Sequence, residues 1–213
     1  MSDASLPAQS SGRNWLLLLL ELRTYVALIL VFVYFAIMAP NFLSVDNAVL
    51  ISKHVALNAF LAIGMTFVII TGGIDLSVGS VVGPTGMVAG YLVLYGIDPG
   101  LGWSIQFNTF EIVLIVCLVG VFVGWINGVL VTRLNVAPFI ATLGTLYVAR
   151  GAALLLSDGR TFPNLNGNPD YGSASFPLIG AGSFLGLPVM IWTLIAVTLV
   201  AIYISRRTPL GRH

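Results

Sequence analysis

Long apolar segments, separated by short polar or glycine- and proline-containing breaks, follow one another along most of this chain. A helix needs about 20 apolar residues to cross the hydrocarbon core of a bilayer, and it satisfies its backbone polar groups internally. The sequence therefore predicts an all-α integral membrane protein of about six transmembrane helices. The expected spans are residues 24–39, 54–71, 75–95, 110–131, 138–156 and 187–204.

The composition agrees with a membrane protein and excludes several other classes. Hydrophobic residues make up 58% of the chain and charged residues only 8%, whereas about 25% charged residues is usual in soluble domains. The Lys and Arg residues form no basic patch, so no nucleic-acid partner is expected. The single cysteine, Cys117, excludes an internal disulfide and a cysteine metal site. His54 has no second ligand at a suitable spacing, and no metal site is predicted.

The distribution of basic residues predicts the orientation in the membrane. Residues 1–23 are expected to form a cytoplasmic tail followed by an interfacial helical lead-in from Trp15. An even number of spans places both ends of this chain on one side, and the positive-inside rule favours the cytoplasm. Arg150, inside the fifth span, is expected to snorkel to the outer interface, with a gating or docking role as the alternative. The expected cytoplasmic residues are Arg13, Arg23, Arg133, Arg206, Arg207 and Arg212, against Lys53 and Arg160 outside.

The stretch from Thr71 to Gly90 interrupts the apolar pattern with a charge and several glycines. Asp75 is the only acidic residue between Asp46 and Asp98. We expect the third helix to start at Asp75, whose carboxylate would accept hydrogen bonds from the first free N–H groups of that helix. Pro84 is expected to kink the same helix. The second and third helices are thus predicted to be a broken, glycine-rich pair.

Glycines recur at helical spacing in the third and fourth predicted spans. Residues three and four apart share one face of a helix, and small residues there let a neighbouring backbone approach closely. We therefore expect two tight packing faces. They are Gly79, Gly83, Gly86 and Gly90 in one span, and Gly120, Gly124 and Gly128 in the next.

The fifth predicted span has a clear start, and a long segment follows it. Pro138 is expected to take the first helical position, where its missing N–H costs nothing. Ser157 to Gly186 is rich in Gly, Pro and Asn. It is too long to be only a connector, so we expect it to be functional.

Several short motifs resemble the permease subunits of bacterial ABC importers for monosaccharides, the ribose, xylose and galactoside group. The first is TGGIDLSVGS at Thr71 to Ser80. The other motifs are APNF at 39–42, GxxNG at 124–128, PFIATLGT at 138–145 with Arg150 and Gly151 after it, and TPLGR at 208–212. The resemblance covers the chain from about residue 39 to its end.

The resemblance implies the N-terminal part of a type II-like ABC importer permease of roughly ten spans. Such a permease works with a second permease copy, with ABC ATPase subunits that use ATP and Mg, and with a periplasmic or extracellular sugar-binding protein. It lies in the bacterial inner (cytoplasmic) membrane, binds no cofactor directly and is not itself an enzyme. Residues 24–213 would then be an incomplete transmembrane domain, truncated at its C-terminal side. Its coupling segment, which docks on the ATPase, would start with Thr208, Pro209, Gly211 and Arg212.

We therefore expect a membrane-spanning subunit that forms the path for a pentose, a hexose or a related sugar. Two alternatives stay open. One is a truncated, non-transporting product that only associates with intact permease, and the other is a subunit of an ATP-independent transporter. The residues expected to line the path are Asn58, Asp75, Ser77, Asn127, Phe139 and Thr142.

Some of these candidates also have a structural interpretation. Asp75 either lines the path or caps a helix, and we favour the cap, because a neutral sugar does not need a full charge. Asn127 could bind sugar hydroxyls or a neighbouring helix. Phe139, Tyr147 and Trp125 could stack on a sugar ring, but aromatic residues in membrane helices more often pack or sit at the interface.

Overall fold

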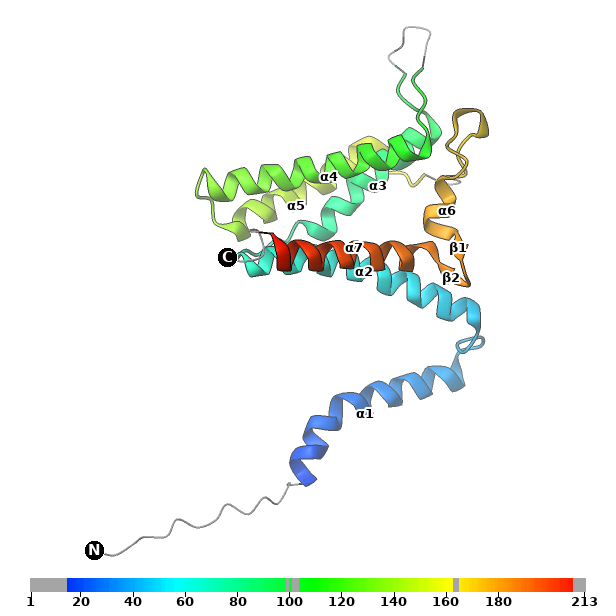
Figure 1. Ribbon diagram of the computed structural model, residues 1–213, viewed down its shortest axis with the longest axis vertical. Helices are drawn as coiled ribbons and strands as arrows, with labels where there is room; N and C mark the ends of the chain where they lie inside the picture. Colours follow the sequence, from blue (N-terminus) through cyan, green and yellow to red (C-terminus); the bar gives the residue numbers. More distant parts are fainter. Residues whose placement is uncertain (1–14, 99, 101–103, 163–164, 209–213) are drawn as a thin grey trace, which may run out of the picture. The chain divides into compact units, whose positions relative to one another are not determined.

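The structure is a computed structural model that describes residues 15–98, 100, 104–162 and 165–208 (Figure 1). It is mostly helical, which confirms the predicted fold class. One short antiparallel pair, β1 with β2, interrupts the helices. In chain order the elements are α1 Trp15–Met38, α2 Val45–Ile70, α3 Val78–Leu94, α4 Thr109–Thr132, α5 Pro138–Ser157, η1 Pro169–Tyr171, α6 Phe176–Ala181, β1 Ser183–Phe184, β2 Leu187–Pro188 and α7 Val189–Arg207.

The chain divides into two compact units, Met1–Ala48 and Val49–His213. In the first unit, α1 is one continuous helix that includes the predicted lead-in from Trp15. Phe42, in the turn after α1, packs edge-on against Phe32, with ring centroids 5.3 Å apart, and stacks on Phe35 at 6.0 Å. These contacts fold the turn back onto the last part of α1. The second unit contains nearly all of α2 and every later element.

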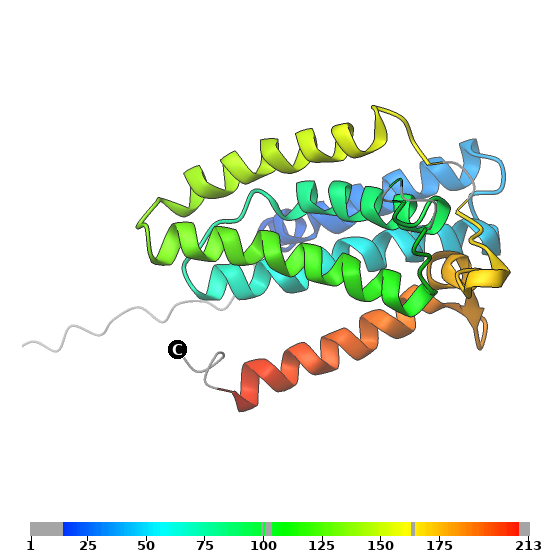
Figure 2. The ribbon, with the colours of Figure 1, turned by 90° about the horizontal axis from the view of Figure 1, so that it is seen from above.

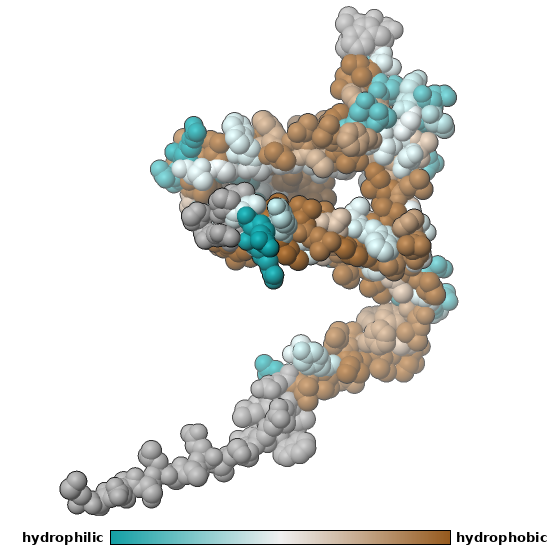
Figure 3. All heavy atoms as spheres, viewed as in Figure 1, coloured by the Kyte–Doolittle hydropathy of each residue, from teal (hydrophilic) through white to brown (hydrophobic). Residues whose placement is uncertain are grey.

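The helices have the length and apolarity that a bilayer requires. Among the described residues, four helices are long and apolar enough to cross a membrane, namely α2, α4, α5 and α7. The apolar stretch Leu22–Met38 within α1 and the 17-residue helix α3, Val78–Leu94, correspond to the first and third predicted spans. Apolar side chains cover much of the helical surface in Figure 3, and polar ones gather at helix ends and connections. Large exposed side chains such as Leu155 (82% exposed) fit a lipid environment.

The helices α3, α4 and α5 pack against one another in the second unit (Figures 1 and 2). The α5 face that packs here carries small residues at four-residue spacing, Ala141, Thr145, Ala149 and Ala153. A Cβ added at Gly83 of α3 would lie 3.7 Å from the Cβ of Ala153. Small residues on α5, which the glycine pattern did not predict, therefore allow the close approach of α3 and α5.

The described part of the segment between α5 and α7 contains short helices and a strand pair, and it packs on one end of α3 and α4. Ile112 of α4, which is fully buried, forms a core cluster with Ala89, Leu92 and Val93 of α3. Leu165 and Phe176, from the segment after α5, pack against this cluster. The backbone N–H of Thr109 also donates to the carbonyl of Gly172 (3.4 Å). The length of this segment thus reflects a packed cap over the helix ends.

Two helices begin at residues other than those expected. The helix α2 starts at Val45, well before residue 54, because the Ser44 hydroxyl accepts a hydrogen bond from the Asn47 N–H (3.2 Å) and Asp46 lies in the first turn. Most of the interval between the first two predicted spans, residues 40–53, is therefore helical. The helix α3 starts at Val78 and not at Asp75, and Ser77 takes the N-cap position.

The starts of α4 and α5 follow known capping rules. Asn108 and Glu111 form a reciprocal capping box at α4, in which each side chain accepts a hydrogen bond from the other residue's backbone N–H (3.0 and 2.9 Å). Pro138 is the first residue of α5, as predicted.

Candidate functional site

Three of the predicted site residues come together where α3 begins. Ser77 precedes α3, Asn127 lies in the second half of α4, and Thr142 lies in the second turn of α5. All three are buried, with exposed fractions of 1%, 7% and 3%. Buried polar side chains need hydrogen-bond partners, and these residues find them in one another and in the chain before α3.

Asn127 bridges two helices through both ends of its amide. Its Nδ2 donates to the Ser77 hydroxyl oxygen (3.0 Å), and its Oδ1 accepts from the Thr145 hydroxyl. Thr145, which was not among the predicted residues, lies three residues after Thr142 and so near it on the helix surface. That spacing within PFIATLGT could have identified it.

Asp75 holds the break before α3 in shape, but it does so as part of a turn and not as the helix cap. Its Oδ1 accepts hydrogen bonds from the Ser77 backbone N–H (2.7 Å) and from the Ser77 hydroxyl (2.6 Å). The prediction that Asp75 accepts from the first free N–H groups of the helix is therefore wrong. An aspartate that bonds the backbone two residues ahead forms an Asx turn, which orients the chain just before the helix.

Thr142 ties the same break to α5. Its Oγ1 accepts a hydrogen bond from the Leu76 N–H (3.2 Å) and donates within its own helix to the Pro138 carbonyl (2.8 Å). The chain between α2 and α3 is thus held from two sides, by Asn127 of α4 and by Thr142 of α5. We refer to Asp75, Ser77, Asn127, Thr142 and Thr145 as the polar cluster.

Two cavities flank the polar cluster. The larger, about 330 Å³, lies between the chain from Thr71 to Asp75 and the facing parts of α4 and α5, including Asn127 and Thr142. The smaller, about 220 Å³, is lined by Asp75, Ser77, Asn127 and residues of α3 and α4. Asp75 and Asn127 line both cavities, so hydroxyl, amide and carboxylate groups face each of them. Groups of this kind can hydrogen-bond a neutral, hydroxylated ligand.

The α4 glycines line these cavities and do not form a tight packing face within the described chain. A Cβ added at Gly120, Gly124 or Gly128 would meet no atom within 4 Å. Gly124 lines both cavities. Because glycine has no side chain, this face of α4 leaves open volume beside Asn127. Close packing against this face remains a prediction.

The α3 glycines are only partly packed. A Cβ added at Gly79 or Gly86 would meet nothing within 4 Å, whereas one at Gly90 would lie 2.5 Å from the Phe162 ring. The α3 residues that the structure buries include Ser80 and Pro84. Of the predicted glycine face, Gly83 and Gly90 therefore contact other elements, whereas Gly79 and Gly86 face open space.

The side chains of the remaining candidates line neither of the two cavities that flank the polar cluster, although the backbone carbonyl of Phe139 accepts a hydrogen bond from the Thr142 hydroxyl (3.5 Å). Asn58 is exposed on α2, where its amide donates to the His54 carbonyl of the same helix (3.1 Å). Phe139, Trp125 and Tyr147 are 52%, 62% and 66% exposed. Arg150 is exposed as well. The structure therefore brings none of the three aromatic rings to the polar cluster.

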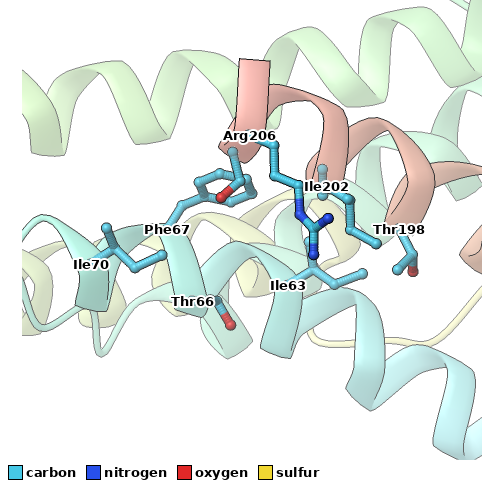
Figure 4. A pocket seen from close by; sticks show the side chains of 9 residues that line it. Ile63, Thr66, Phe67, Ile70, Thr198, Ile202 and Arg206 are labelled. Atoms are coloured by element: carbon cyan, nitrogen blue, oxygen red, sulfur yellow. The ribbon is translucent and has the colours of Figure 1, made fainter. Parts of the chain in front are cut away.

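The predicted coupling segment is described only at its first residue. Thr208 is the C-cap residue after α7, and its hydroxyl donates to the Ile204 carbonyl (2.6 Å). Pro209, Gly211 and Arg212 lie outside the described residues. Just before Thr208, Arg206 extends toward Ile63 of α2 across a largely apolar cavity of about 220 Å³ (Figure 4). This cavity contains no member of the polar cluster.

We expect the two replacements Asp75→Asn and Asp75→Ala to differ. Asparagine keeps an Oδ1 acceptor for Ser77, so assembly and uptake should stay close to normal. Alanine removes both hydrogen bonds to Ser77 and should destabilise the break by about 1–3 kcal/mol. Yield of folded protein in detergent and uptake in cells measure the two effects. Normal assembly with abolished uptake in both variants would instead give Asp75 a direct role in the sugar path.

Comparison with known protein families connects this geometry to transport. Residues 47–213 match the family described as the permease component of the branched-chain amino acid transport system. The chain is 41% identical over 195 residues to the ribose import permease of Haemophilus influenzae, covering 92% of this chain and 56% of that protein. It is 35% identical to the ribose import permease of Bacillus subtilis, covering 91% and 55%.

Other relatives carry different names. The D-allose transport system permease of Escherichia coli K12 is 34% identical, with 89% of this chain and 54% of that protein covered. The chain thus spans about half the length of the curated relatives it matches. No solved structure matches it.

Proposed function

Because this chain belongs to the family described as the permease component of the branched-chain amino acid transport system, we propose that it forms part of the membrane-spanning permease subunit of an ATP-driven monosaccharide importer. The names of its relatives support a sugar as the substrate, since two are ribose import permeases and one is a D-allose permease. The observation that carries the proposal is the polar cluster. It places hydroxyl, amide and carboxylate groups beside two cavities among apolar helices.

We propose that the permease acts with partners that supply energy and substrate. These are a second permease copy, ABC ATPase subunits that use ATP and Mg, and a periplasmic or extracellular sugar-binding protein. The proposed location is the bacterial inner membrane with both ends of this chain cytoplasmic. In the second unit, α2, α4 and α7 end on the same side (Figure 1), where Arg133, Arg206 and Arg207 lie. This grouping of basic residues agrees with the positive-inside rule.

The break before α3 suggests how the permease would change conformation. Side-chain hydrogen bonds from α4 and α5 hold it, and the open volume beside Gly120 and Gly124 leaves room for α3 to shift. We propose that α3 takes a second arrangement when partner subunits bind and hydrolyse ATP, which would give alternating access. In this proposal the polar cluster holds one arrangement of α3, and its cavities accept the sugar in passage.

Uptake of labelled D-ribose tests the proposal. The protein is produced with the ATPase and sugar-binding protein of a ribose importer, in cells lacking their own ribose permease and in proteoliposomes. We expect uptake that requires ATP. Uptake without ATP would favour an ATP-independent transporter. No uptake by the chain alone, together with its co-purification with an intact ribose permease produced in the same cells, would favour a non-transporting product. Either result would contradict the proposal.

A further inference from the structure

A separate cavity lies at the opposite end of α3 from the polar cluster. It measures about 710 Å³ and lies between the last turn of α3, the connection after α3 and the chain that follows α5. The helix α3 has 17 residues, so the two ends are about 25 Å apart. We call this space the Tyr91 cavity. Its main side chains are Tyr91, Tyr95, Asp98, Asp158, Arg160 and Phe162.

The chain after α5 reaches the cavity through a well-defined turn. Asp158 and Gly159 adopt left-handed conformations, with φ of 49° and 71°. The Gly159 N–H donates to the Leu154 carbonyl (3.0 Å), and the Arg160 N–H donates to the Ser157 carbonyl (2.9 Å). Such bonds satisfy the last carbonyls of a helix. They therefore fix the backbone that carries Asp158 and Arg160 at the edge of the cavity.

The aromatic side of the cavity depends on a glycine. The Phe162 ring lies so close to Gly90 that an added Cβ would be 2.5 Å from its Cδ2. Phe162 meets the Tyr95 ring edge-on, with centroids 6.3 Å apart, and the Tyr91 and Tyr95 centroids are 5.3 Å apart. Tyr91 and Tyr95 remain 40% and 57% exposed. The cavity thus has an aromatic wall that a ligand can reach.

The chemistry of the lining favours a neutral, polyhydroxylated ligand. The carboxylates of Asp98 and Asp158 accept hydrogen bonds from hydroxyl groups, and the Arg160 guanidinium donates to ring or hydroxyl oxygens. The formal charges of Asp98, Asp158 and Arg160 sum to −1, so the lining disfavours an anionic ligand and is compatible with a neutral one. Aromatic rings cover the apolar face of a ligand of this kind. The cavity volume falls within the usual range for small-molecule sites, and a concave surface favours a small molecule over a protein partner.

We propose that the Tyr91 cavity is a second monosaccharide site, distinct from the polar cluster and at the other end of α3. This inference rests on the proposed function as a sugar permease. In the proposed site, Tyr95 stacks on the sugar ring. Arg160 and Asp158 bind the hydroxyl groups of the sugar. A sugar would occupy this site before it reaches the cavities at the break.

Binding of D-ribose to the purified full-length protein in nanodiscs tests the site, using saturation-transfer NMR without any binding protein or ATPase. We expect Tyr95→Ala and Arg160→Gln each to weaken D-ribose binding about tenfold or more. Tyr95→Phe keeps the ring and should bind nearly as the wild type does. Tyr203→Ala, which removes a tyrosine of similar exposure from α7 (65%), is the matched control and should leave binding unchanged.

The outcomes separate this inference from the proposed function. Arg160 is exposed, so Arg160→Gln remains informative if Tyr95→Ala does not fold. Wild-type uptake of D-ribose with unchanged D-ribose binding in Arg160→Gln would overturn the second site alone. If the variants lose uptake only through weaker capture of the binding protein, with D-ribose binding unchanged, the cavity is a docking surface and the inference is also overturned. Absence of wild-type uptake would contradict the proposed function itself.

Discussion

Replacing Asn127 by leucine is expected to destabilise the protein by about 1–3 kcal/mol and to reduce D-ribose uptake strongly. Leucine is similar in size but removes the hydrogen bond to the Ser77 hydroxyl and the acceptor for Thr145. Asn127 is only 7% exposed, so the two hydrogen bonds that are lost join buried or partly buried groups of three different segments. The break before α3 then loses its attachment to α4. Thermal unfolding in detergent and uptake in cells measure the two effects.

Asn58→Leu is the matched control. Asn58 is exposed, and its amide bonds only a carbonyl of its own helix. Its replacement should change the unfolding free energy by no more than about 0.5 kcal/mol, which is typical of surface sites. Equal destabilisation by the two variants would contradict the bridging role of Asn127. Loss of uptake by Asn58→Leu alone would return Asn58 to the sugar path.

Replacing Ile112 by alanine is expected to destabilise the cap over the ends of α3 and α4 by about 2–5 kcal/mol. Ile112 is fully buried against Leu92 and Val93, with Leu165 and Phe176 packed on the same cluster. Truncation of the Ile112 side chain leaves a cavity that the surrounding residues fill only in part. The segment between α5 and α7 should loosen first, because it rests on this cluster. Thermal unfolding and limited proteolysis of that segment report the effect.

Leu114→Ala provides the comparison within the same helix. Leu114 is 49% exposed, so its truncation removes surface that faces lipid or detergent. We expect little change in thermal unfolding and no faster cleavage between α5 and α7. If Ile112→Ala left the proteolysis pattern unchanged, the cluster would not be what holds this segment in place.

Much of the fold was predictable because its causes are local. Runs of apolar residues and the prolines and glycines that end them predicted the helices, and Pro138 begins α5 as expected. The apolar run alone predicted too late a start for α2. Ser44 and Asp46 before and within its first turn are ordinary signals of a helix start. Asp75 was correctly associated with the break, yet its bonds go to Ser77 and not to the helix.

By itself, the sequence determined the membrane class and the family resemblance, because apolar length and short motifs are properties of neighbouring residues. Only the tertiary structure decided which polar residues meet. Asn58 and Asn127 are alike as residues in apolar helices, yet one bonds its own helix and the other joins Ser77, fifty residues away. The tertiary structure also decided which glycines are packed, because glycines on an open helix face and glycines on a packed helix face have the same spacing in the sequence. Helical period places a residue on a face, and packing alone decides what that face contacts.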